Sequence, residues 1–132
     1  MVPKVIQEWH QLVQSRDSKV LDTLLADDAT MYSPVVHTPQ KGKAITKLYL
    51  MGAMHTIGNE HFKYIQEVYN EHFAVLEFET LIDGKTVNGI DMITWNEDDQ
   101  ITEFKVMIRP LQAINAVHKA MGEALAKFQQ GK

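Results

Sequence analysis

Residues 73–109, FAVLEFETLIDGKTVNGIDMITWNEDDQITEFKVMIR, decide the fold. Apolar residues alternate with polar ones along this stretch, which is the pattern of β-strands with one buried face. Asp83-Gly84 predicts a hairpin turn, and the polar run 96–99 predicts a second turn. We therefore expect strands at 73–82, 86–95 and 100–109, joined as an antiparallel meander. A shorter alternating run around residues 62–68 predicts a fourth strand of the same meander.

Helical periodicity dominates the residues on either side of the meander. Apolar residues spaced by three and four predict helices at 5–13 and 20–25, the second with Asp17 or Ser18 as its N-cap. A helix at 45–57 is apolar nearly all round, so we expect it to be enclosed or to lie over a cavity. Residues 29–33 are expected to be extended, and Pro110 opens a last helix.

These elements predict an α+β fold. We expect a cone-shaped curved antiparallel sheet, with the N-terminal helices over its concave face and an extra C-terminal helix. The last helix either covers the mouth of the cone or packs across a dimer, and periodicity does not distinguish the two. With 132 residues, and no linker or repeat, the chain is expected to be a single domain spanning 1–132.

Composition narrows the possible functions. The formal charge of -4 argues against nucleic acid or an anionic membrane surface as the partner, because both require a basic face. The sequence has no cysteine, which excludes disulfides, thiol nucleophiles and thiolate metal sites. No apolar stretch is long enough to span a membrane, and Glu8 lies too early for a signal peptide, so we expect a cytoplasmic protein.

Two short phrases resemble a known family. LADDAT at 25–30 and GIDMITW at 89–95 are similar to the corresponding phrases of bacterial ketosteroid isomerases, and the resemblance covers residues 5–109. The sequence thus resembles the nuclear transport factor 2-like superfamily, in its SnoaL-like and ketosteroid isomerase-like branch. The resemblance implies the cone fold, back-to-back sheet dimers and a site without metal. The six histidines also lack the HxxxH and HExxH spacings, and we expect no cofactor.

The resemblance implies roles for four residues. Asp91 falls where ketosteroid isomerase has its oxyanion-hole aspartic acid, and Tyr49 falls where that enzyme has a supporting tyrosine. Trp9 replaces the tyrosine that donates to the oxyanion, and Ser33 replaces the aspartate that moves the proton. A serine cannot act as a base unaided, so we do not expect steroid isomerisation by that mechanism.

Asp91 is the strongest candidate on physical grounds. Strand alternation places it on the same face as apolar side chains, where burial would favour the neutral acid as a hydrogen-bond donor. The alternative is a carboxylate at a rim or dimer interface, paired with a cation. His37 or His55 could supply the missing base. The alternative is that His37 faces solvent in its loop and that His55, near the end of its helix, faces the C-terminal end of the helix dipole. Asp91, Tyr49 and His37 form our candidate catalytic set, and the expected ligand-binding residues are Trp9, Leu25, Ser33, Met54, His55, Phe62, Tyr64, Phe78, Trp95, Val106 and Ile108.

Five charged residues share one expected outer face of the sheet: Glu77, Glu79, Glu103, Lys105 and Arg109. We expect them to form cross-strand ion pairs there. An outward Arg109 also argues against the Asp-Arg-Asp cluster of limonene-epoxide hydrolase-like enzymes.

Apolar residues also lie on that outer face: Ile90, Met92 and Met107. A sheet with two apolar faces predicts that a second copy covers the outer one, giving a homodimer.

Three functions remain open. The first is an isomerase- or cyclase-type enzyme acting on a small hydrophobic carbonyl compound by proton transfer or enolate stabilisation. The second is a non-catalytic protein that binds a small hydrophobic molecule in the same pocket. The third is a structural dimer whose pocket has collapsed.

Overall fold

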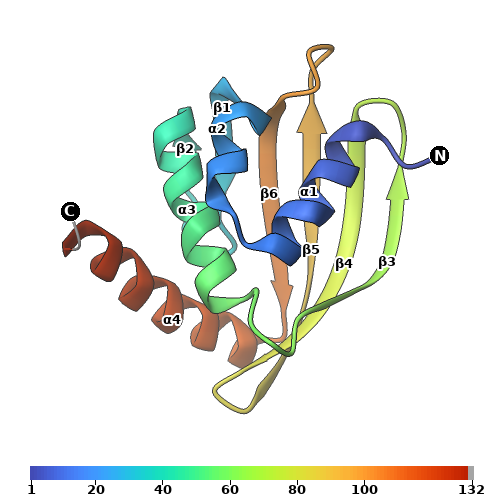
Figure 1. The fold of residues 1–132 in the computed structure, drawn as a ribbon. Coiled ribbons are helices and arrows are strands. Elements are labelled where there is room, and N and C mark those ends of the chain that lie inside the picture. The colour runs from blue at the N-terminus through green and yellow to red at the C-terminus, as the bar shows by residue number, and fades with distance from the viewer. Residues whose placement is uncertain (131–132) are drawn as a thin grey trace.

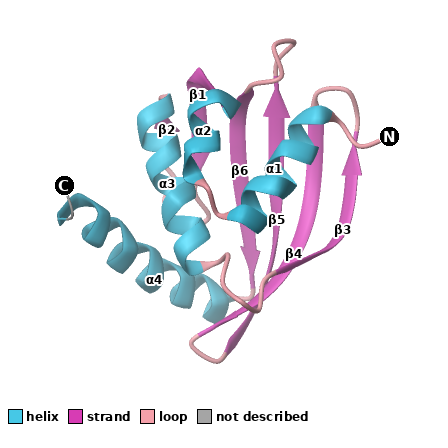
Figure 2. Cartoon of the chain, viewed as in Figure 1, coloured by secondary structure: helices cyan, strands magenta, loops and turns pink. Residues whose placement is uncertain are grey.

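The computed structural model describes residues 1–130 as a helical layer on one face of a curved six-stranded sheet (Figures 1 and 2). The α+β cone fold expected from the sequence is confirmed. In chain order the elements are α1 (Lys4–Ser15), the 3-10 helix η1 (Ser18–Val20), α2 (Leu21–Leu24), β1 (Leu25–Tyr32), β2 (Gln40–Lys41), α3 (Lys43–Thr56), β3 (Lys63–Tyr69), β4 (Phe73–Ile82), β5 (Lys85–Trp95), β6 (Ile101–Arg109) and α4 (Leu111–Gln130).

The strands lie in the order β2-β1-β6-β5-β4-β3. β3 to β6 form the expected antiparallel meander. However, β1 pairs with β6 in parallel, so the sheet is mixed and not antiparallel throughout. Local alternation could not predict this pairing, because the two strands come from opposite ends of the sheet-forming sequence. β1 also begins at Leu25 instead of Ala29, and the two-residue β2 was not predicted.

The helices pack on the concave face and at one end of the sheet. Asp17 is the N-cap of the short helical segment, because its side chain accepts a hydrogen bond from the Lys19 N–H at 3.1 Å. α4 packs on its own chain, against α3 and the adjoining ends of β4, β5 and β6. The Thr56 hydroxyl of α3 donates to the Met121 sulfur of α4 at 3.3 Å.

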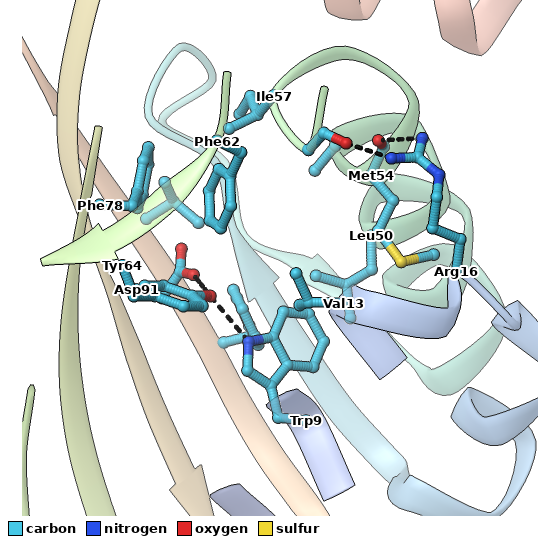
Figure 3. Close-up of a pocket in the computed structure, with 14 residues that line it drawn as sticks. Trp9, Val13, Arg16, Leu50, Met54, Ile57, Phe62, Tyr64, Phe78 and Asp91 are labelled. Atoms are coloured by element: carbon cyan, nitrogen blue, oxygen red, sulfur yellow. Dashed lines mark hydrogen bonds between the residues drawn. The ribbon is translucent and has the colours of Figure 1, made fainter. Parts of the chain in front are cut away.

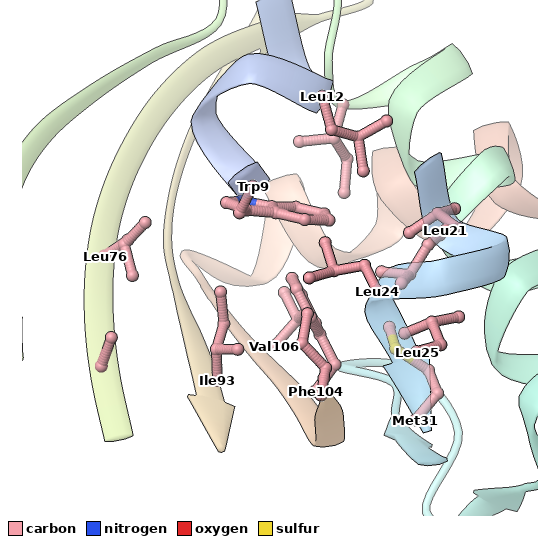
Figure 4. Packing of buried hydrophobic residues seen from close by; sticks show 14 of the residues in the cluster. Trp9, Leu12, Leu21, Leu24, Leu25, Met31, Leu76, Ile93, Phe104 and Val106 are labelled. Carbon is pink, nitrogen blue, oxygen red and sulfur yellow. The ribbon is translucent and has the colours of Figure 1, made fainter. Parts of the chain in front are cut away.

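The hydrophobic core lies between the sheet and the helices, where Trp9 of α1 packs on Phe104 of β6 (Figure 4). The rings of Trp9 and Phe104 are 4.8 Å apart. Each fully buried side chain of this size contributes about 1.5–3 kcal/mol. α1 is therefore held over the sheet by apolar packing.

The outer face of the sheet carries hydrogen bonds where we expected cross-strand ion pairs. Asn88 donates to Glu77 at 3.0 Å and accepts from Arg109 at 3.2 Å. The Lys105 ammonium lies 4.9 Å from the centre of the Tyr32 ring. Among the described residues, no ion pair joins the five charged residues of this face. The expectation of ion pairs was wrong because the Asn88 side-chain amide lies between Glu77 and Arg109 and hydrogen-bonds to both.

Gly89 is required by close packing. A Cβ at this position would lie 2.6 Å from the Phe78 ring and 2.6 Å from the Met107 carbonyl oxygen. We expect Gly89→Ala to lower the free energy of unfolding by about 1–3 kcal/mol, because either the ring or a strand must move. At Gly122 a Cβ would meet no atom within 4 Å. Gly122→Ala is therefore the control, expected to raise stability by up to about 1 kcal/mol in the same urea titration. A neutral Gly89→Ala variant would contradict this packing.

Candidate functional site

A cavity lies between α1, α3 and the concave face of the sheet. Its volume is about 50 Å³, or about 490 Å³ when the open mouth is included. The lining residues come from six segments: Trp9, Val13, Arg16, Leu50, Ala53, Met54, Ile57, Gly58, Phe62, Tyr64, Phe78, Asp91, Phe104 and Val106. The cavity is therefore narrow and mostly apolar.

Three polar side chains form a hydrogen-bonded chain at the inner end of the cavity (Figure 3). The Trp9 indole N–H donates to the Tyr64 hydroxyl oxygen at 2.8 Å. That hydroxyl in turn donates to one carboxyl oxygen of Asp91 at 2.5 Å, a length typical of a strong bond to a carboxylate. The other carboxyl oxygen has no hydrogen-bond partner among the described side chains. It is the oxygen through which Asp91 can meet a ligand.

Burial sets the protonation of this chain. Asp91 is only 6% exposed, and desolvation raises its pKa to about 7, although the hydrogen bond from Tyr64 opposes the rise. Desolvation also raises the pKa of Tyr64 well above its usual value, and the adjacent Asp91 adds to this. Near neutral pH, Asp91 therefore exists both as the acid and as the carboxylate, while Tyr64 keeps its proton.

Aromatic rings form the wall beside the carboxyl group. The rings of Phe62 and Phe78 are stacked at 5.3 Å, and Phe62 meets Tyr64 edge-on at 4.9 Å. Phe78 is fully buried and lies opposite Gly89 in the β4–β5 pairing. These rings exclude water from Asp91, which is the cause of its raised pKa.

Arg16 lies on the opposite side of the cavity from Asp91 (Figure 3). It is the C-cap of α1, with φ of 60°, and its side chain is exposed. The guanidinium donates to the carbonyl oxygens of Gly58 and, at 2.8 Å, of Met54. The cavity thus has a buried carboxyl group on one side and an exposed cation on the other.

The structure brings seven of the predicted site residues together around the cavity. They are Asp91 together with Trp9, Met54, Phe62, Tyr64, Phe78 and Val106. The other predicted residues lie outside its lining.

Two of these are on α3. α3 and its C-cap residue contribute four residues to the cavity lining, Leu50, Ala53, Met54 and Ile57, which form one face at the spacing i, i+3, i+4, i+7. Tyr49 and His55 lie beside this face, and neither side chain lines the cavity. His55 instead meets the Phe128 ring edge-on at 6.0 Å.

Ser33 and His37 lie in the loop after β1. The Ser33 hydroxyl accepts a hydrogen bond from the Val35 N–H at 3.1 Å, which stabilises the loop, and His37 is exposed. Neither residue is part of the cavity lining. The structure therefore does not bring His37 together with Asp91 at the cavity.

Leu25, Trp95 and Ile108 belong to the core packing. Leu25 of β1 and Trp95 of β5 both pair with Ile101 of β6. Trp95 is four residues along β5 from Asp91. Ile108 pairs with Gly89, two residues along β5 from Asp91 in the opposite direction, and packs against the core. Strand alternation predicted the face of Trp95 and Ile108 correctly, but their position along the strand places them away from the cavity. Leu25, expected in a helix, is the first residue of β1.

Sequence reasoning missed seven lining residues: Val13, Arg16, Leu50, Ala53, Ile57, Gly58 and Phe104. The signal for Arg16 was present, because Trp9, Val13 and Arg16 follow i, i+4, i+7 on one face of α1. An arginine on the apolar face of a helix points to a site more specifically than another apolar residue does.

Within residues 1–130, no helix is long and apolar enough to cross a bilayer. The described side chains also include no group of three His, Asp or Glu residues placed to hold a metal ion.

Comparison with known proteins agrees with this architecture. The profile of the SnoaL-like domain matches residues 6–104. The chain belongs to the SnoaL-like domain family. A steroid delta-isomerase from Pseudomonas aeruginosa is 32% identical, with a TM-score of 0.89 over 96% of this chain and 92% of that one. The nuclear transport factor 2-like, ketosteroid isomerase-like resemblance is thereby confirmed.

More distant structures share the fold of this SnoaL-like protein. An uncharacterised protein with a cystatin-like fold from Silicibacter pomeroyi is 24% identical, with a TM-score of 0.83 over 91% of this chain and 84% of that one. The epoxide hydrolase/cyclase-like enzyme SalBIII, of pyran ring formation in salinomycin, is 14% identical, with a TM-score of 0.63 over 80% and 88%. No functionally curated protein matched the chain significantly.

The raised pKa of Asp91 makes the stability of this SnoaL-like protein depend on pH. Between about pH 4 and 7 Asp91 keeps a proton in the folded state that it has lost in the unfolded state, so its contribution to the free energy of unfolding falls as pH rises through this range. The full shift corresponds to at most about 4 kcal/mol. Asp91→Asn removes this contribution. The free energy of unfolding of the variant, measured by urea unfolding, should therefore rise relative to that of the parent by a few kcal/mol from pH 4 to 7. The exposed Asp27→Asn is the control; an equal slope in both variants would disprove the shift.

Proposed function

We propose that this SnoaL-like protein binds a small hydrophobic carbonyl compound in the cavity and catalyses an isomerase- or cyclase-type proton transfer on it. The proposal rests on one observation: Asp91 presents a carboxyl group, bonded to Tyr64 at 2.5 Å, at the inner end of an apolar cavity. Such a group can exchange a proton with a bound ligand or, when neutral, donate a hydrogen bond to its oxygen.

The size of the cavity limits the ligand. The cavity has a volume of about 50 Å³. It therefore suits a flat single ring or a short chain better than a four-ring steroid. The stacked ring of Phe62 offers a flat surface against which such a ring can lie. We therefore propose single-ring or short-chain carbonyl compounds as substrates.

The reaction also needs a base. Among the described lining residues, Asp91 is the only carboxyl group, and no histidine lines the cavity. We propose that the Asp91 carboxylate accepts a proton from the carbon next to the carbonyl, and that the resulting acid returns it to a different carbon. The enolate oxygen would accept a hydrogen bond from the Tyr64 hydroxyl in between. The group ends in its starting state, so no further reactant is required.

A non-catalytic binding function is the second candidate. It is favoured by the same absence of a second base from the lining, because enzymes of this kind usually separate the proton carrier from the oxyanion donor. In that case Asp91 and Tyr64 would only orient a ligand oxygen.

Hydrogen–deuterium exchange at the ligand separates the two functions. Thermal unfolding against a panel of single-ring ketones and phenols identifies a binder. NMR in D2O then follows exchange of the ketone protons next to the carbonyl. For an enzyme we expect exchange that Asp91→Asn slows by about 100-fold or more, with a smaller loss of affinity. Asp27→Asn should leave the exchange rate unchanged. Stabilisation without exchange would support binding alone, and no stabilisation by any compound would contradict both functions.

We also propose a cytoplasmic homodimer formed through the outer sheet face. Met107 is 50% exposed there and Val68 is 62% exposed, whereas α1, α2 and α3 all lie on the opposite face (Figure 2). Glu103 and Lys105 share this face. Across a two-fold axis, Glu103 of one copy can form an ion pair with Lys105 of the other.

Light scattering tests the dimer. The parent should have about twice the 15.1 kDa mass of the chain, and Met107→Glu should shift it to the monomer, because a buried unpaired charge opposes association. Leu111→Glu, at an exposed position on α4, is the control and should remain dimeric. A monomeric parent at micromolar concentration would contradict the proposal.

A further inference from the structure

Arg16 is the exposed residue of a lining whose other thirteen members are buried or partly buried. It lies on the opposite side of the cavity from Asp91 (Figure 3). The guanidinium is fixed in place by the Met54 and Gly58 carbonyl oxygens at the end of α3. It therefore presents a positioned positive charge at the mouth of an apolar cavity.

This charge has no acidic partner among the described residues. The ion pairs of residues 1–130 involve His10, Lys47 and His61, but not Arg16. Two of the five guanidinium N–H groups donate to the two carbonyls, which leaves three without a hydrogen-bond partner in the described part of the chain. A guanidinium with free N–H groups is well suited to a carboxylate, which it can bind with two parallel hydrogen bonds.

We propose that Arg16 determines specificity by binding the carboxylate of an amphipathic ligand, so that hydrophobic oxo acids are preferred as substrates over neutral ketones. This inference rests on the proposed function and names its substrate class. The two ends of the cavity fix the orientation of such a ligand. Its carboxylate would be repelled and desolvated beside Asp91, whereas at Arg16 it meets a partly hydrated cation. The carbonyl end is then directed to Asp91 and Tyr64.

Phenol-terminated acids test this inference without knowledge of the natural substrate. The probes are 4-hydroxyphenyl alkanoic acids with side chains of two to six carbons, each paired with its primary amide, which has nearly the same shape but no charge. Calorimetric titration of the parent should show that the acid binds about 5- to 10-fold more tightly than its amide. This preference should be greatest at one chain length, where the carboxylate reaches Arg16, and should weaken at high salt.

Arg16→Gln removes the charge and keeps an amide that can donate to one of the α3 carbonyls. It should abolish the preference for the acid and leave amide affinity within about threefold of the parent. Arg16→Lys retains the charge and should keep part of the preference. The control is Arg109→Gln, which changes the only other arginine of the chain, outside the cavity, and should behave as the parent.

Three results would overturn the inference. They are equal binding of acid and amide by the parent, an equal loss of both in Arg16→Gln, or an unchanged preference in that variant. An equal loss would mean that Arg16 only stabilises the end of α3. If Arg16→Gln fails to fold, Arg16→Lys and the salt dependence of the parent decide the question. The proposed function stands or falls separately: it survives if the neutral amides bind and Asp91→Asn weakens them, and it fails with the inference if no probe binds.

Discussion

The buried carboxyl group of Asp91 is the constraint on which the site depends. Taking a carboxylate out of water costs more free energy than one hydrogen bond returns, so the protein keeps the proton to higher pH and supplies one short bond from Tyr64. Tyr64 is on β3 and Asp91 on β5, with β4 between them. The tyrosine ring must therefore reach across β4, where it meets the Phe78 ring edge-on at 6.5 Å. Because Gly89 has no side chain, it leaves the space that the Phe78 ring occupies.

The same polar chain fixes the position of α1. Trp9 packs its ring on Phe104 and donates its N–H to Tyr64, so one side chain contributes both to the core and to the site. Close by, His10 Nε2 lies 2.7 Å from a Glu67 carboxylate oxygen, which adds a second polar link between α1 and β3. β3 is an edge strand with mostly exposed residues and buries little apolar surface of its own. Polar links between α1 and β3 therefore add to the apolar packing that holds α1 over the cavity.

The sequence predicted those features that depend on short-range periodicity. Strand alternation placed Asp91, Phe78 and Val106 on the concave face, and the Asp83-Gly84 turn gave the register of the hairpin. It failed where distant segments meet. The parallel β1–β6 pair and the donation from Trp9 to Tyr64 join residues far apart in the chain, which no local pattern encodes. Tyr49 lies outside the cavity lining for a different reason: its neighbour Leu50 faces the cavity, and one residue on a helix changes the direction of a side chain by about 100°.

The position of Asp91 also bears on whether the protein is only a scaffold. A scaffold gains nothing from a buried carboxyl group, and replacement of such a group by an apolar residue of similar volume is often stabilising. Here the group also requires Tyr64 as a donor, Trp9 as a donor to Tyr64, and empty space beside its second oxygen. A collapsed pocket would fill that space. Tyr64, Trp9 and this space are thus all arranged around a carboxyl group whose burial costs free energy. A role for the cavity in holding a ligand therefore explains the structure better than a purely structural dimer does.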